Sequence, residues 1–436
     1  MLCPISRTGV PLIACHILAL CWLNLFPLAA SAQEEAAKFP DRNWPQFLGP
    51  MRNGHSPESN LNLDWLAHPP RTRWIAEPGA GYTSITVVNQ RVFLGAQRGD
   101  SDFIVCYNRE TGREEWSYVI GRGYQDVQQQ GPGPRATPTI DGDHLYSLGP
   151  SGQLFCLTTA EGREVWKVNI FQATGAADPA GENLYWGMSG SPLVVGNLVI
   201  CQPGGDRDNS VAAFDKETGA VIWKAASTYR SYASPLAVTL HGHRQLLCYA
   251  GDALLGMQPA TGQILWRYAH QNQYKCNCAT PVVIGNRVLV STAYGGGSAL
   301  LTINTADERW SAKEDWNSRR LQSLFATPIV IDNLLFGCHG DLGVCTLRCL
   351  DLATGKLAWT AREPGRCAMI AAAGHLICLS EDGTLRVVKA TREGYVETGK
   401  IDGLLRARSW ATPALAGGHL FARDQQRLIC LNLQKE

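Results

Sequence analysis

Basic and aromatic residues that could bind a ligand recur in short segments of this sequence, each close before a Thr-Pro or Ser-Pro position or a related one. A guanidinium group can fork onto a carboxylate or a phosphate, and an aromatic ring offers a stacking face. At six of these positions, residues 137, 191, 234, 280, 327 and 412, none of the five preceding residues is acidic. The candidate ligand-binding residues are Arg135, Tyr185, Trp186, Arg230, Tyr232, Lys275, Arg366, Arg408 and Trp410.

This set of residues has two interpretations on the sequence alone. In the first, the side chains form a pocket for an anionic or carbohydrate-like ligand, or for an acidic peptide of a protein partner. In the second, they fill a channel by stacking on one another and by pairing with acids of neighbouring loops, such as Asp206, Asp252 and Asp382.

Cysteine and histidine do not group into a zinc signature. The chain has 15 cysteines but no paired C-x2-C motifs. Most cysteines recur at equivalent strand positions and behave as small buried hydrophobes. Cys276 with Cys278, and the group Cys338, Cys345 and Cys349, could instead form disulfides or ligate a metal. We predict no catalytic residue and no metal site. Four histidines lie in or next to the first hairpin turn of four different repeat units, so they cannot converge on one metal; they are His144, His243, His375 and His419.

An internal repeat supplies the elements that must position the candidate residues. An apolar strand, a Thr-Gly or equivalent turn and a Trp about four residues later recur along the chain. Tryptophans at one position per repeat indicate a structural role, since a large ring can fill the wedge between neighbouring repeats. Trp310 looks like a degenerate copy of this position. The regular copies are Trp74, Trp116, Trp166, Trp223, Trp266 and Trp359.

The Thr-Pro positions provide a second marker, followed each time by two apolar strands around a Gly, Asn or Asp turn. With weaker copies near Ser84 and Met369 there are eight units of about 47 residues, each with about four short strands. The sequence therefore predicts an all-β fold, an eight-bladed β-propeller of four-stranded antiparallel blades. The last unit lacks its Trp strand, and residues 73–75 have the missing pattern, so we expect an N-terminal strand to close the ring.

The chain divides into three parts. Residues 1–32 have the apolar run and the small-residue site of a signal peptide, with cleavage near Ala32. The alternative is an N-terminal membrane anchor, but the site Ala30-Ser31-Ala32 favours cleavage. Residues 33–72 are rich in proline and predict an extended arm, and residues 73–436 form the propeller. We therefore expect a periplasmic or secreted protein with no transmembrane segment in the mature chain.

Composition and charge exclude several classes of protein. Hydrophobic residues make up 45% of the chain and charged residues 18%, with 44 glycines. These values suit many short strands and tight turns, and they disfavour disorder and coiled coils. Without residues 1–32 the chain has 38 basic and 38 acidic residues, since only Arg7 is lost from 39 and 38. This balance gives no reason to expect a nucleic acid as partner.

The Thr-Pro starts, the Thr-Gly-x-x-x-Trp ends and the segment Asn43-Trp44-Pro45-Gln46-Phe47-Leu48-Gly49-Pro50 together resemble the pyrroloquinoline-quinone (PQQ)-like propeller repeat family, across residues 43–436. The resemblance implies one of two functions. Some members are secreted quinoprotein dehydrogenases that hold the quinone and a calcium ion at the propeller axis. Others are non-catalytic, such as the lipoprotein of the outer-membrane protein assembly machinery.

By this resemblance, the enzymes need a pair of adjacent cysteines over the quinone, carboxylate and amide ligands for calcium, and an aspartate base. This sequence has no Cys-Cys pair, and Cys276 and Cys278 come nearest to one. We therefore predict a binding or scaffolding protein without chemistry or cofactor of its own, which uses its axial face. The alternative is a PQQ-dependent alcohol or sugar oxidoreductase with calcium.

Overall fold

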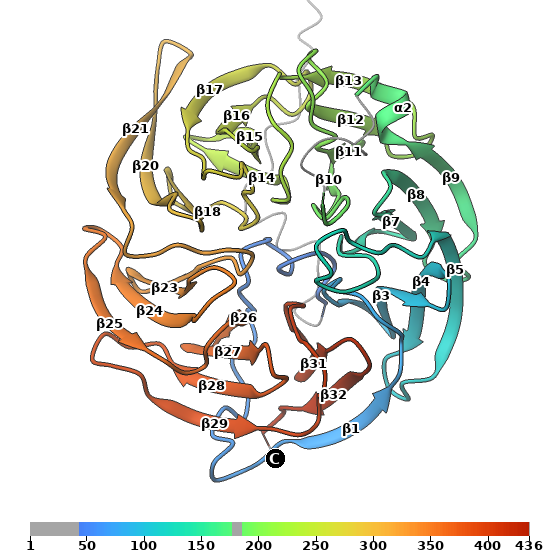
Figure 1. Ribbon diagram of the computed structural model, residues 1–436, viewed down its shortest axis with the longest axis vertical. Helices are drawn as coiled ribbons and strands as arrows, with labels where there is room; N and C mark the ends of the chain where they lie inside the picture. Colours follow the sequence, from blue (N-terminus) through green and yellow to red (C-terminus); the bar gives the residue numbers. More distant parts are fainter. Residues whose placement is uncertain (1–42, 177–184, 436) are drawn as a thin grey trace, which may run out of the picture.

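The computed structural model describes residues 43–176 and 185–435, which form a ring of eight four-stranded antiparallel sheets (Figure 1). This confirms the predicted eight-bladed β-propeller. The proposed signal peptide, residues 1–32, lies outside the described residues. The first four blades consist of β2 (Thr86–Val88), β3 (Arg91–Arg98), β4 (Ser101–Asn108) and β5 (Glu114–Arg122); β6 (Thr139–Asp141), β7 (His144–Leu148), β8 (Gln153–Thr158) and β9 (Glu164–Asn169); β10 (Leu193–Val195), β11 (Leu198–Cys201), β12 (Val211–Asp215) and β13 (Val221–Ala225); β14 (Leu236–Leu240), β15 (His243–Tyr249), β16 (Ala253–Met257) and β17 (Ile264–Ala269).

The other four blades complete the ring in chain order. A short helix, α2 (Ile170–Thr174), follows β9, and no helix in the described ranges is long and apolar enough to cross a membrane. The strands are β18 (Val282–Ile284), β19 (Arg287–Thr292), β20 (Gly297–Ala306) and β21 (Arg309–Ser318); β22 (Ile329–Ile331), β23 (Leu334–His339), β24 (Thr346–Asp351) and β25 (Leu357–Ala361); β26 (Cys367–Ala372), β27 (His375–Ser380), β28 (Leu385–Lys389) and β29 (Glu397–Ile401); β30 (Ala414–Ala416), β31 (His419–Arg423), β32 (Leu428–Asn432) and β1 (Arg71–Ala76).

A tryptophan on the outermost strand joins one blade to the next, as the repeat predicts. The Trp116 indole N–H donates to the Thr159 carbonyl at 3.1 Å, and its ring packs over Gly162 of the next blade. Gly162 has a φ of 67°, and a Cβ there would lie 2.4 Å from the ring, so a side chain is excluded. The same joint recurs as Trp74 with Gly112, Trp166 with Gly219, and Trp223 with Gly262.

The blade of β18–β21 departs from the predicted pattern. Trp316 takes the wedge position there, because its indole N–H donates to the Leu352 carbonyl at 2.8 Å and its ring covers Gly355. Trp310 lies further out on the hairpin, opposite Thr305, since β20 and β21 are each ten residues long. The interpretation of Trp310 as the degenerate copy is therefore wrong, and the lengthened hairpin is the reason.

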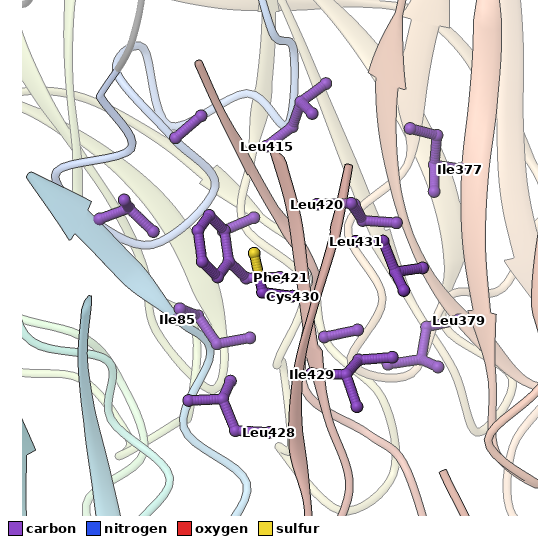
Figure 2. Close-up of a cluster of buried hydrophobic side chains, with 14 of the residues drawn as sticks. Ile85, Ile377, Leu379, Leu415, Leu420, Phe421, Leu428, Ile429, Cys430 and Leu431 are labelled. Carbon is purple, nitrogen blue, oxygen red and sulfur yellow. The ribbon is translucent and has the colours of Figure 1, made fainter. Parts of the chain in front are cut away.

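The N-terminal strand closes the ring, as expected. β1 pairs antiparallel with β32, with Trp74 opposite Cys430. Figure 2 shows the apolar core around this blade, in which Phe421 and Leu428 lie near Ile85 of the first blade, while Ile377 of the preceding blade packs from the other side. The closing blade is thus held by hydrophobic contact with both neighbours as well as by strand pairing.

The segment before β1 runs across one end of the propeller axis (Figure 1, blue). Trp44 bridges to β2, and His55 bridges to β26. Between them Arg52 is buried, with hydrogen bonds to residues of three further blades. The segment then passes the last two blades, where Leu61 bridges to residue 434 and Trp65 covers residue 399. Residues 43–70 therefore close this end of the axis.

Candidate axial binding site

The Ser-Pro and Thr-Pro positions and their equivalents form a belt of hydrogen bonds around the axis. The backbone N–H at one such position donates to the hydroxyl of the equivalent residue in the adjacent blade, at 2.9–3.1 Å. The structure has five of these bonds among its described residues, from Ser84 to Thr137, Thr137 to Ser191, Ser191 to Ser234, Thr280 to Thr327, and Thr412 to Ser84. The belt arranges the preceding segments around one centre.

Those segments enclose a pocket of about 150 Å³ on the axis. Residues that precede the innermost strands of seven blades line the pocket, together with Leu342 of the β23–β24 connection and Phe47 of the segment that closes the other end. An apolar cavity of this size can hold one benzene ring. The pocket therefore suits a single ring or a single side chain.

Aromatic rings make up much of the wall. Trp410 stacks on Tyr82 with 4.9 Å between ring centroids and an interplanar angle of 26°, and Phe325 is tilted against Trp410 at 5.1 Å. Trp186 meets Tyr232 edge-on at 5.2 Å. Rings held in this way offer faces and edges to a planar or apolar group without further ordering.

Arg135 is the cation of the pocket, and its hydrogen bonds are incomplete. Its Nη2 pairs with Asp126 Oδ2 at 2.8 Å, and its Cζ lies 4.9 Å from the centroid of the Tyr82 ring. The Asp126 side chain is fully buried. Arg135 Nη1 is also buried, and it has no hydrogen-bond partner in the structure. A guanidinium N–H without a partner is unfavourable when buried, so a ligand carboxylate or carbonyl would be stabilised here.

The loop between β5 and β6, which carries Arg135, is fastened at both ends. Arg408 Nη1 donates to the Gln130 carbonyl at 2.8 Å, and the Tyr124 N–H donates to Asp102 Oδ2 at 3.1 Å. Burial raises the pKa of Asp102 to about 6, because removal from water disfavours its charged form. The position of Arg135 therefore depends on a loop whose anchor titrates near neutral pH.

The pocket brings together part of the predicted set. Arg408 lies at the rim, with its Cζ 4.9 Å from the centroid of the Trp410 ring. Tyr185 is 45% exposed beside Trp186. Four of the nine predicted residues line the pocket itself, namely Arg135, Trp186, Tyr232 and Trp410.

The other three predicted residues are held elsewhere. Arg230 is buried within the wall, and its Cζ lies 5.4 Å from the centroid of the Phe171 ring. Lys275 Nζ lies 2.8 Å from the centroid of the Tyr229 ring. Arg366 donates to a backbone carbonyl of the β23–β24 connection. None of the three lines the pocket, and each is held by the contact just described.

The acids that meet these cations differ from the three named from the sequence, Asp206, Asp252 and Asp382. Asp252 pairs with Arg267 on the outer strand of its own blade. The acids at the pocket are Asp126, on Arg135, and Glu381, which accepts a hydrogen bond from a pocket indole at 2.9 Å. Stacking and pairing therefore do occur, as the second interpretation has it, but they leave Arg135 Nη1 without a partner.

Several lining residues are not among the nine predicted ones. Tyr82 and Phe325 lie in the segments before β2 and β22, which the repeat indicates should meet at the axis, but they were not chosen as ligand-binding residues. Tyr294 reaches the pocket from the β19–β20 connection, for which the sequence has no signal. Cys276 and Cys278 were considered as disulfide partners or metal ligands and not as ligand-binding residues, and both line the pocket.

The residues of the pocket do not fit a calcium-bound quinone. Calcium takes about six to eight oxygen ligands, often carboxylates. No Asp, Glu or His is among the described lining residues, and the described ranges contain no group of three or more His, Cys, Asp or Glu placed to hold a metal ion.

Comparison with known proteins agrees with the fold. A PQQ-type family model described as outer membrane protein assembly factor BamB matches residues 100–361. No curated protein sequence matches the chain. BamB from Moraxella catarrhalis is 14% identical with a TM-score of 0.59, over 83% of this chain and 99% of that one. Quinohemoprotein alcohol dehydrogenase from Comamonas testosteroni is 12% identical with a TM-score of 0.65, over 94% and 83% of the two chains. At these identities the structures show a shared fold.

Proposed function

This chain belongs to the PQQ-like propeller repeat family whose model is described as outer membrane protein assembly factor BamB, and we propose that it is a non-catalytic binding protein, periplasmic or secreted, that docks an acidic segment of a partner protein at its axial pocket. Family membership alone does not separate binding proteins from enzymes, because the same fold is shared with dehydrogenases. The pocket residues therefore carry the proposal.

The unpaired Nη1 of Arg135, set among aromatic rings, is the observation that supports binding most directly. A carboxylate can take this donor in a charge-assisted hydrogen bond while an adjacent ring stacks on the wall. Proton abstraction needs a positioned base, usually a histidine or a carboxylate. Among the described residues that line the pocket there is neither.

Exposed apolar side chains around the same mouth favour a protein as the partner. Val127 is 70% exposed on the loop that carries Arg135, and Val344 is 90% exposed on the loop that carries Leu342 into the pocket. Leu342 itself is 49% exposed. Large apolar groups gathered beside a pocket are typical of interaction sites. A partner segment with an acid for Arg135 and apolar neighbours for the rim would match this surface.

Selection from a random peptide library on the protein lacking residues 1–32 tests the proposal. We expect enriched peptides that combine an acidic with an aromatic residue. Loss of one charge-assisted hydrogen bond weakens binding by about 10- to 100-fold, which is the effect we expect for Arg135→Ala. Arg113→Ala, an exposed position on the β4–β5 turn, is the matched control and should bind like wild type. Equal dissociation constants for all three proteins would overturn the proposal.

The oxidoreductase alternative is tested on the same preparation. The protein is mixed with PQQ and calcium, and dye reduction is followed over a panel of alcohols and sugars. We expect no turnover above that of the Arg135→Ala variant. Turnover that is saturable in one substrate and depends on both additions would contradict a non-catalytic role.

A further inference from the structure

Cys276 and Cys278 form a pair of thiols in the wall of the axial pocket, in the segment that enters β18. Their Sγ atoms lie 3.5 Å apart, and both residues line the pocket. Cys278 is the most exposed of the twelve cysteines in the described part of the chain, since the other eleven are buried. The buried ones include Cys106 and Cys156, each packed in the hydrophobic wedge between blades.

The turn between the two thiols is held from several sides. Asn277 is fully buried, and its Nδ2 donates to the Ala250 carbonyl at 2.6 Å. Its backbone N–H donates to Ser231 Oγ at 2.7 Å. Asn272 donates from Nδ2 to the Cys276 carbonyl at 2.8 Å and accepts from the Cys276 N–H at 3.2 Å. This network holds the two side chains together and directs them at the pocket.

We propose that Cys276 and Cys278 are a dithiol–disulfide couple that reacts with small disulfides reaching the axial pocket. The site is independent of peptide docking, because it needs only access for a small molecule. The sulfur atoms must approach by roughly 1.5 Å to bond, since a disulfide spans about 2.05 Å. Closure within one short turn requires no movement of one blade against another.

The reaction balances as a two-electron thiol–disulfide exchange. One protein thiolate attacks a sulfur of the small disulfide, whose S–S bond breaks, and the first small thiol leaves with a proton. The second protein thiolate then attacks the protein sulfur of the mixed disulfide and releases the second small thiol. The protein pair is oxidised, the small disulfide is reduced to two thiols, and no further reactant is needed.

Hydroxyethyl disulfide, in buffers of varied ratio to 2-mercaptoethanol, is the probe that tests this, because each half of it is no larger than an amino-acid side chain. After alkylation and trypsin digestion, residues 276–287 form a single peptide that contains both thiols and no other cysteine, because Lys275 and Arg287 flank it. In the native protein we expect the ratio of disulfide to dialkylated peptide to be at least roughly tenfold higher than in urea at the same buffer ratio, since folding holds the thiols together. Peptides 321–348 and 367–386, each with two cysteines, serve as internal comparisons.

Cys276→Ser and Cys278→Ser complete the test. Each removes the second step, so we expect one mercaptoethanol adduct on the remaining thiol in place of the internal disulfide. Unchanged tryptophan fluorescence would confirm that the variants are folded. Either of two results would overturn the proposal. One is a disulfide in residues 276–287 that forms only after unfolding in urea, and the other is the absence of an adduct on both folded variants.

Discussion

The two ends of the propeller axis each hold an arginine, and the two are used in opposite ways. At the closed end, Arg52 donates from Nε to Gln46 Oε1 at 2.7 Å, and its two Nη atoms reach the Pro235 carbonyl at 2.8 Å, Thr139 Oγ1 at 3.1 Å and the carbonyls of residues 191 and 192. All five N–H groups have partners. At the open end, Arg135 leaves Nη1 without one.

This difference separates a structural cation from one available to a ligand. Arg52 is the hub that attaches the N-terminal segment to three blades, and burial lowers its pKa to about 9. Phe47 of the same segment lines the pocket. Because Arg52 attaches this segment to the blades, the segment closes the channel at one end and forms the floor of the pocket. Arg135 lies in the wall above, where its Nη1 is buried without a hydrogen-bond partner. The axial channel is therefore a pocket closed at one end, with an unpaired hydrogen-bond donor in its wall.

The largest effect is expected from removing the hub. Arg52→Ala should lower the free energy of unfolding by about 4 kcal/mol, because the carbonyls of Ser191, Pro192 and Pro235 lose their donor and a cavity opens on the axis. Urea unfolding followed by tryptophan fluorescence measures this. Arg113→Ala is the exposed control and should change stability by less than about 0.5 kcal/mol. Equal stability of the two variants would remove the distinction between the two ends.

A smaller loss of stability is expected at the open end. Arg135→Ala should cost about 2 kcal/mol, because the buried carboxylate of Asp126 loses its partner but keeps the Gln130 N–H, at 3.0 Å. The double variant Arg135→Ala with Asp126→Asn removes the uncompensated charge, so it should recover about half of that loss in the same unfolding assay. No recovery would mean that packing of the guanidinium, rather than charge, stabilises this end.

The smallest effect concerns the pH dependence of the open end. The pKa of Asp102 in the fold, about 6, lies above its ordinary value of 3.8, so the folded state binds this proton more tightly than the unfolded chain does. Protonation of Asp102 therefore raises the free energy of unfolding by about 1 kcal/mol as the pH falls from 7 to 5. The Asp102→Asn variant should lack this increase. The measurement is the change in unfolding free energy between pH 7 and pH 5, compared between wild type and the variant. Parallel pH profiles would rule out this carboxyl as the titrating anchor.

The inter-blade joints were predictable because both partners recur in most repeats. Trp266 is an exception, since its indole N–H donates to Gln245 of its own blade at 2.8 Å. A Trp that needs a flat surface and a Gly with positive φ that provides one are each visible as a spacing, as with Trp116 and Gly162. The prediction failed at Trp310 only because the hairpin of β20 and β21 is longer than the repeat implies. Local periodicity therefore carried most of the fold.

The pocket was only half predictable, as Arg135 and Arg230 show. Both precede a Ser-Pro or Thr-Pro position by a few residues, yet only Arg135 lines the pocket. Arg230 turns into the wall, where its Nε donates to the Pro203 carbonyl at 2.8 Å. Gly204 makes room for it, since a Cβ there would lie 1.9 Å from Arg230 Cγ. A glycine 26 residues earlier in the chain thus decides the direction of this side chain.

The sequence by itself determined the eight blades, their closure by the strand at Trp74, and the ring of Ser and Thr around the axis. These features follow from repeated short-range patterns, which act the same way in every unit. Only the tertiary structure decided that Arg52 seals one end and that Arg135 keeps a free donor at the other. Those outcomes depend on carbonyls, acids and vacant space contributed by distant blades, and no spacing in the sequence encodes them.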